Sequence, residues 1–329
     1  MADLSDLHEL IELGDVDELV RHIDRLCANR DWAGLVDLRD QCRAALERGK
    51  QLWPASSHAE YRLALEADPA WAGPVLVEGT GRFTLGPLAE VAASTHTWDQ
   101  LDPHVPDGPL RAVTAHECVV RGADLVGCDG IDTAVLDLPL RLEPWEPTYP
   151  LASYRAHEAD FPSPPPTPLE PTTLPPPGAQ VSDPTVTDAL LELVRPWVAE
   201  SNGRAEAVAV EGGAEAAIAA LGVRTAHTAP VSAAEALATM AWAGASGGAH
   251  GRRRGMAYGR FGAWWATAAL AGLADEWPVT AAELGEAAEE LRWVAWGAGE
   301  PPTGWIFRLA VEDPVDGTAW AASAVDAAT

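Results

Sequence analysis

The chain has 329 residues and a formal net charge of −27. Because 47% of its residues are hydrophobic, it is long and apolar enough to fill the cores of two domains. Acidic residues outnumber basic ones in both halves, and because phosphate contacts require a basic face, we expect no direct nucleic-acid binding. The four cysteines show neither metal-ligand nor redox spacing, and the N-terminus is acidic where a signal peptide is basic. We therefore expect a cytoplasmic protein with no metal and no cofactor.

Residues 1–136 are predicted to form an all-α domain. Apolar residues recur at helical spacing up to about residue 26, Asp15 is placed to cap the second helix, and a third helix is expected over 31–48. The tetrapeptide Asp31-Trp32-Ala33-Gly34 nearly returns as Ala70-Trp71-Ala72-Gly73, at an offset close to the period of HEAT-type repeats. We expect a HEAT-like stack of helix hairpins, with an irregular helical bundle as the alternative.

Residues 137–184 are predicted to be a proline-rich strap and linker. More than half of the prolines of the chain lie here, and proline fixes φ and lacks an amide donor, so the segment is expected to be extended. Its first half carries Trp145, Tyr149, Tyr154 and Phe161, and we expect it to lie across the N-terminal domain. Residues 162–184 are expected to be the hinge.

Residues 185–329 are predicted to form an α+β domain, with a small sheet and two long helices on one face. The expected helices cover residues 188–200, 213–221, 232–245, 253–273, 280–291 and 317–327. The expected strands cover residues 205–210, 223–228, 291–296 and 305–311, and the last two form an antiparallel hairpin with a long turn at 297–304. The whole chain is therefore expected to be of the α+β class.

Residues 255–273 contain a single charge and follow three arginines, which is also the pattern of a membrane span with a basic flank. Most of the stretch is alanine and glycine, and Arg260 lies in its first half. A buried helix is therefore expected, and no membrane insertion.

The stretch between Glu235 and Asp275 contains no carboxylate and holds the candidate anion-binding residues. These are His250, Arg252, Arg253, Arg254 and Arg260. Three features typical of anion-binding sites coincide here. Glycines expose backbone amides, a helix N-terminus offers partial positive charge, and the planar guanidinium of arginine donates paired hydrogen bonds. The segment matches neither a Walker loop nor a Rossmann fingerprint. The alternative is that these arginines pair with the chain's own carboxylates.

A strip of small residues at a spacing of four is predicted to be a helix-packing surface. It consists of Gly251, Gly255, Gly259 and Ala263. On the same helix Arg260 precedes Trp264 by four positions, so a cation–π contact is expected there.

The run from Ser246 to Trp265, together with Glu312-Asp313-Pro314, is similar to uncharacterised proteins that share a domain of unknown function in high-GC bacteria. The resemblance lies in the C-terminal half. A single lysine and heavy use of alanine, glycine and arginine are typical of such genomes. The resemblance implies no known activity.

The preferred function is binding: a cytoplasmic adaptor whose arginine-rich helix start accepts an acidic group of a protein partner or an acidic small molecule. The first alternative is an enzyme or sensor for a phosphorylated or carboxylated small molecule in a cleft at Arg252–Arg254, with His250 as acid or base. The second alternative is an acidic mimic of nucleic acid, which rests on the net charge alone. The sequence shows no nucleophile motif, metal triad or paired general acid and base. Because an active site normally shows one of these, binding is favoured over catalysis.

Overall fold

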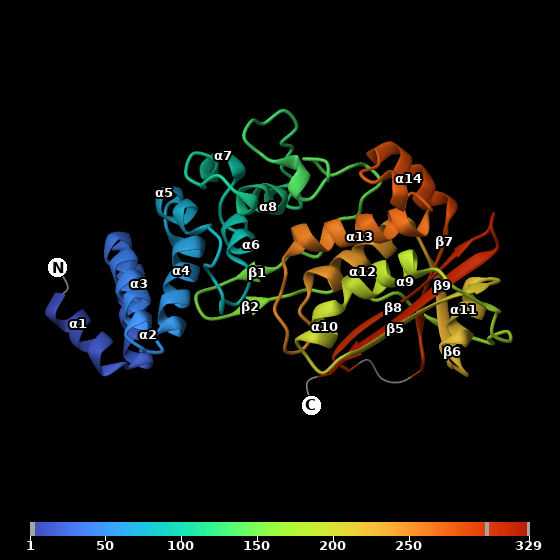
Figure 1. Cartoon of the computed structure of the whole chain (residues 1–329), viewed down its shortest axis with the longest axis horizontal. Coiled ribbons are helices and arrows are strands. Elements are labelled where there is room, and N and C mark those ends of the chain that lie inside the picture. The colour runs from blue at the N-terminus through green and yellow to red at the C-terminus, as the bar shows by residue number, and fades with distance from the viewer. Residues whose placement is uncertain (1–3, 300–302, 328–329) are drawn as a thin grey trace. The chain divides into compact units, whose positions relative to one another are not determined.

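The computed structural model describes residues 4–299 and 303–327, which divide into two compact units (Figure 1). Unit 1 combines the residues up to Val135 with Ala152–Phe161, and unit 2 combines Leu136–Leu151 with the residues from Pro162 onward. The chain therefore passes between the units three times.

Unit 1 is helical. Its helices are α1 (Leu4–Leu13), α2 (Val16–Ala28), α3 (Trp32–Glu47), α4 (Trp53–Glu66), α5 (Pro69–Ala72), α6 (Leu88–Ala93), α7 (Trp98–Leu101) and α8 (Pro109–Val119), with 3₁₀ turns at Gly73–Val75 and Thr133–Val135. The long helices α2, α3 and α4 pack side by side (Figure 1). The carboxylates of Asp15 and Asp31 accept hydrogen bonds from the third residues of α2 and α3, so the expected cap at Asp15 is confirmed.

The two similar tetrapeptides take different structures. Asp31 caps the four-turn helix α3 and the following Trp32 is buried. The second copy lies in the four-residue helix α5 and the 3₁₀ turn after it, and Trp71 is 37% exposed. Pro69 and Pro74 delimit this short element, because proline cannot continue a helix from its interior. The second tetrapeptide, unlike the first, therefore does not begin a long helix.

A hairpin of β1 (Ser153–Tyr154) and β2 (Ala159–Asp160) completes unit 1. The Tyr61 hydroxyl of α4 donates to the carbonyl oxygen of Arg155 at 2.6 Å, and the Tyr154 hydroxyl donates to Glu90 of α6 at 2.6 Å. Two helices thus fix the hairpin.

The described residues of unit 2 form a seven-stranded sheet in the order β3-β6-β7-β8-β9-β5-β4, and all pairs are antiparallel. The strands are β3 (Glu170–Thr172), β4 (Gln180–Val181), β5 (Arg204–Glu211), β6 (Ala226–Val231), β7 (Arg292–Gly297), β8 (Trp305–Asp313) and β9 (Thr318–Asp326). The helices are α9 (Pro184–Leu193), α10 (Arg195–Ala199), α11 (Ala214–Ala220), α12 (Ala233–Ala245), α13 (Met256–Leu270) and α14 (Ala281–Glu290), with a 3₁₀ turn at Ala274–Glu276. The predicted α+β class is confirmed.

Helices cover both faces of this sheet (Figure 1). On one face α11 packs through Ala217 and Ile218 against Val294 and Ala310 of the central strands. On the other face α9 and α12 contact the strands, and α13 packs on α9 and α12. Of the two long helices, α12 therefore lies on the sheet and α13 lies on the helices α9 and α12. The sequence predicted that both would pack on the sheet.

The predicted final helix over 317–327 is wrong, because this segment is the strand β9. It lies between β8 and β5, and the four residues Ala319–Ala322 are all buried. Alanine favours helix in isolation, but pairing on both edges and packing on both faces override that preference. The expected hairpin is present as β7 and β8, and the centre of its turn at 300–302 lies outside the described residues.

The proline-rich segment differs from the expected strap and hinge. Trp145 and Tyr149 belong to unit 2, whereas Tyr154 and Phe161 belong to unit 1. Residues 162–184 contribute β3 and β4, which pair with β6 and β5 at the two edges of the sheet of unit 2. Edge strands tolerate proline because one row of amides needs no partner in the sheet.

Among the described residues, no helix is long and apolar enough to cross a lipid bilayer.

Candidate functional site

The arginines Arg252–Arg254 precede α13 and do not lie on it. Helix α13 begins at Met256, and its N-cap Gly255 has a φ of 98°, a conformation that favours glycine. The expected helix start at 253 is therefore wrong by three residues. The backbone N–H of Arg254 donates to the carbonyl oxygen of Ala245 at 2.8 Å, which ties the segment to the end of α12.

Backbone amides of the loop before α13 bind acceptors of unit 2. The amide of Ala249 donates to the buried carboxylate of Asp326 at 2.6 Å, and that of Arg252 donates to Glu200 at 3.1 Å. The amide of the exposed His250 donates to the Ser201 hydroxyl at 3.2 Å. In many glycine-rich loops such amides bind external anions. Here side chains of the same chain accept hydrogen bonds from them.

Two of the candidate anion-binding residues, Arg254 and Arg260, have different partners. The Arg254 guanidinium lies 3.8 Å from Glu192 and 5.8 Å from the ring centre of Tyr258. Arg252 and Arg253 lie in the same loop segment, while Arg260 lies one turn into α13 and is fully buried. Arg254 and Arg260 therefore occupy separate environments.

Arg260 is part of a buried polar network centred on Glu146. Its guanidinium donates to both carboxylate oxygens of Glu146 at 2.7 Å and to the carbonyl oxygens of Pro139 and Arg141 at 2.9 and 2.8 Å. The predicted cation–π contact is present, with the guanidinium 5.3 Å from the ring centre of Trp264. The network fastens the segment 136–151 to α13.

Three further groups complete the bonding of Glu146. The backbone N–H of Glu143 donates to its Oε1 at 2.9 Å. The Tyr149 hydroxyl and the Trp264 indole N–H donate to its Oε2 at 2.6 and 3.0 Å. Burial alone raises the pKa of Glu146, but the hydrogen bonds and positive charge of Arg260 outweigh it and hold the pKa below its ordinary value. The carboxylate is therefore ionised and fully bonded, as a structural ion pair requires.

The strip of small residues is only partly helical. Gly251 lies in the loop, where a Cβ would come within 2.3 Å of the carbonyl oxygen of Gly247, and Gly255 is the N-cap of α13. Gly259 lies on α13, and a Cβ there would lie 2.2 Å from the carbonyl oxygen of Ala241 on α12. Ala263, one turn later, is fully buried. Close backbone approach of α12 and α13 thus depends on Gly259.

A large pocket opens at one end of the sheet of unit 2. Its volume is about 760 Å³, and its walls come from the start of α9, the end of α13, the end of β5 and the turn between β8 and β9. Its carboxylates are Asp183, Glu211, Asp275, Asp313 and Asp316, and the lining includes no basic side chain among the described residues. No local sequence pattern marks this pocket, because its lining comes from segments between Val181 and Trp320 that are distant in the chain.

Two of the pocket carboxylates hold the fold together and three point to solvent. Asp183 caps α9 and accepts the indole N–H of Trp320 at 2.9 Å, and Asp313 accepts two amides of its own turn. Glu211, Asp275 and Asp316 are exposed. The exposed three are therefore available to a ligand.

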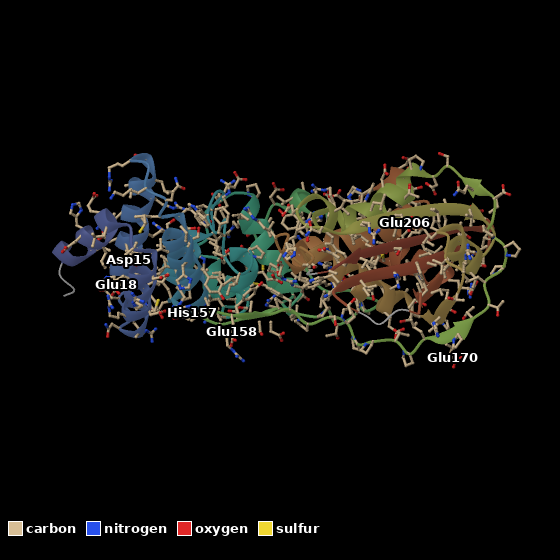
Figure 2. All side chains as sticks on the ribbon, turned by 90° about the horizontal axis from the view of Figure 1, so that it is seen from below. Asp15, Glu18, His157, Glu158, Glu170 and Glu206 are labelled. Carbon is tan, nitrogen blue, oxygen red and sulfur yellow. The ribbon has the colours of Figure 1, made fainter. Side chains whose placement is uncertain are left out.

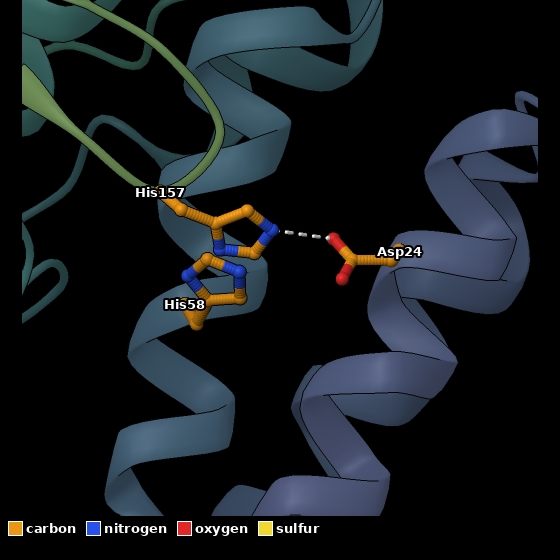
Figure 3. Close-up of side chains that lie close together, drawn as sticks. All are labelled: Asp24, His58 and His157. Atoms are coloured by element: carbon orange, nitrogen blue, oxygen red, sulfur yellow. Dashed lines mark hydrogen bonds and ion pairs between the residues drawn. The ribbon is translucent and has the colours of Figure 1, made fainter.

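Unit 1 contains a cluster of two histidines and one carboxylate (Figure 3). Asp24 comes from α2, His58 from α4, and His157 from the turn of the β1–β2 hairpin. His157 Nε2 lies 3.1 Å from Asp24 Oδ1, and the two imidazoles stack with ring centres 5.3 Å apart. No local pattern could reveal this cluster, because its members lie 34 and 99 positions apart in the chain.

Comparison with known proteins gives one family. The model of a family of unknown function, DUF6183, matches residues 17–313. Neither the curated proteins nor the solved structures include a significant match. The matched range takes in residues of both units, so it extends beyond the C-terminal segment that first showed the resemblance. The chain belongs to the family of unknown function DUF6183.

Proposed function

We propose that this protein is a cytoplasmic binding protein, an adaptor, whose unit 2 accepts a basic group of a partner protein in the pocket at the end of the sheet. The observation that carries the proposal is the pocket of about 760 Å³ with five carboxylates in its lining. This volume is within the range of roughly 300–1,000 Å³ that is typical of ligand pockets.

Three sources of negative potential act together at this pocket. The exposed carboxylates Glu211, Asp275 and Asp316 are the first. The C-terminal end of α13, which lines the pocket at Ala269–Gly272, is the second, because the dipole of a helix favours cations at that end. The third is the net charge of −27, which attracts basic partners over a distance. Lysine or arginine side chains of a partner supply the complementary charge.

Acidic side chains are also exposed outside the pocket (Figure 2). Asp15 on the N-terminal side of α2, Glu170 on β3 and Glu206 on β5 are examples. Such dispersed charges steer a partner without specifying where it binds. The pocket adds concave shape to charge, and this combination favours it over the open surface.

The chemistry of the partner differs from the anion that the sequence analysis favoured. The loop before α13 already binds Asp326 and Glu200, and Arg260 is paired with Glu146. An acidic ligand would have to displace these internal carboxylates. A basic ligand meets no such competition at the pocket.

The state of the cysteines supports a reducing compartment. All four are free thiols, and Cys27, Cys42 and Cys118 are buried. Burial raises the pKa of the Cys42 thiol to about 12, which keeps it protonated and unreactive. Free thiols of this kind are ordinary in cytoplasmic proteins.

The proposal is tested by titrating the protein with a fluorescent hexalysine peptide and recording its anisotropy. The double variant Asp275→Asn/Asp316→Asn should weaken binding about tenfold, equivalent to about 1.4 kcal/mol. The matched control is Glu170→Gln/Glu206→Gln, which removes the same charge from exposed strand positions. Equal weakening by both pairs would show that net charge alone attracts the peptide, and the pocket proposal would then fail.

A further inference from the structure

We propose that Asp24, His58 and His157 form a binding site for a divalent transition-metal ion of the zinc class, with water as the remaining ligand. One coordinating atom of each residue lies within 4.8 Å of those of the other two. In Figure 3 the stacked imidazoles of His58 and His157 face the carboxylate of Asp24. All three residues belong to unit 1, so the site is independent of the pocket in unit 2.

The donor set is that of zinc and its neighbours in the first transition row. Imidazole nitrogen and carboxylate oxygen are standard zinc ligands, and sites with three protein ligands keep a fourth position for water. The Asp24 side chain is 40% exposed and that of His157 is 55% exposed, so water has access. Calcium and magnesium prefer sites made of oxygen alone, which this cluster is not.

His58 is prepared for coordination. Its Nε2 is buried and has no hydrogen-bond partner among the described residues. A metal ion would satisfy a buried polar atom that the surrounding described residues leave without a bond.

Neighbouring side chains hold Asp24 in place. Arg62 of α4 donates a hydrogen bond to Asp24 Oδ1, the oxygen that also contacts His157. The hydrogen bonds that the described residues make to this carboxylate involve Oδ1, which leaves Oδ2 for the metal. Arg62 also binds Glu66 through two hydrogen bonds of 2.7 and 3.1 Å, so the positive charge next to the site is neutralised. Such hydrogen bonds to a ligating carboxylate orient it toward its metal.

Metal binding requires a modest contraction. Tetrahedral ligands at the zinc distances of about 2.0–2.1 Å lie about 3.3 Å apart. His157 lies on the hairpin turn, where its exposed side chain can rotate. The hairpin itself is fixed by Tyr61 and Tyr154 and does not depend on the imidazole of His157. Replacement of His157 should therefore leave the fold of unit 1 intact.

The test uses the full chain carrying Cys128→Ser, so that the exposed thiol does not bind metal. Titration with Co²⁺ at pH 7.5, followed by visible d–d absorption and by calorimetry, should show one saturable site. His157→Gln and Asp24→Asn should each weaken this binding at least tenfold. His104→Gln, the same change at an exposed histidine of unit 1, should leave it unchanged.

Two results would overturn the proposal. The first is a Cys128→Ser parent chain that takes up no Co²⁺ at one equivalent, which would make the cluster a hydrogen-bonded contact only. The second is stoichiometric binding that His157→Gln and Asp24→Asn leave unchanged, which would place the metal elsewhere. Thermal unfolding of each variant without metal checks that the loss of binding is not a loss of fold.

Discussion

Arg260 and Glu146, 114 positions apart in the chain, form an ion pair in which neither side chain has any exposed surface. The pair joins the segment 136–151 to α13 within unit 2. Because both charges are removed from water, each depends on the other for stabilisation.

Arg260→Met should destabilise unit 2 by about 3–5 kcal/mol, because it leaves the carboxylate of Glu146 buried without its cation. Urea unfolding followed by tryptophan fluorescence measures the change. Arg254→Met is the control, since that arginine is partly exposed and lies 3.8 Å from Glu192. Its cost should be no more than about 1 kcal/mol. Equal costs for the two variants would contradict the buried ion pair.

The same pair predicts a dependence of stability on pH. The pKa of Glu146 in the folded protein is below the ordinary value of 4.5, so the unfolded chain binds a proton first as the pH falls. The stabilisation by the pair is therefore fully present above the ordinary value and is lost as the pH decreases through the folded pKa. The free energy of unfolding should converge for the wild type and Glu146→Gln as the pH is lowered below about 4.5. A difference that stays constant down to pH 3 would show that Glu146 is not ionised in the folded state.

Gly259→Ala should be destabilising, by about 1–3 kcal/mol, although alanine is the better helix former. The added Cβ would lie 2.2 Å from the carbonyl oxygen of Ala241 and 2.9 Å from the Cβ of Ala245, so α12 and α13 must separate. The sequence alone does not reveal how close the two backbones are. The melting temperature of Gly259→Ala, compared with that of the wild type, measures this loss of stability.

Gly262→Ala on the same helix is the matched control for this prediction. There the new Cβ meets only the end of the Leu193 side chain, at 2.9 Å, and that side chain can rotate away. This variant should melt close to the wild type. A Gly259→Ala protein as stable as Gly262→Ala would show that the helix interface is looser than the structure indicates.

Local signals in the sequence located several elements well. The carboxylate of Asp15 predicted the start of α2, and the alternation over 205–210 predicted β5. The two apolar runs around residues 297–304 predicted the pairing of β7 and β8. Each of these signals lies within the element that it predicts, so short-range physical chemistry is sufficient.

Features that depend on distant residues were beyond the sequence. Arg260 was predicted as a candidate anion-binding residue, but no nearby residue indicated Glu146 as its partner. The alanines of β9 carry helix propensity, and only their position between β8 and β5 explains why they are extended. The cluster of Asp24, His58 and His157 assembles from two helices and a hairpin turn, so no spacing rule applies to it.

Hydrogen–deuterium exchange of the full chain, with and without saturating hexalysine peptide, tests the central claim most directly. Binding in the acidic pocket should protect amides in residues 181–186, 269–275 and 313–318, which contain most of its lining residues. The Asp275→Asn/Asp316→Asn variant should lose this protection, while Glu170→Gln/Glu206→Gln should retain it. Protection spread over the acidic surface of both units, or confined to the loop at Arg252–Arg254, would contradict the account.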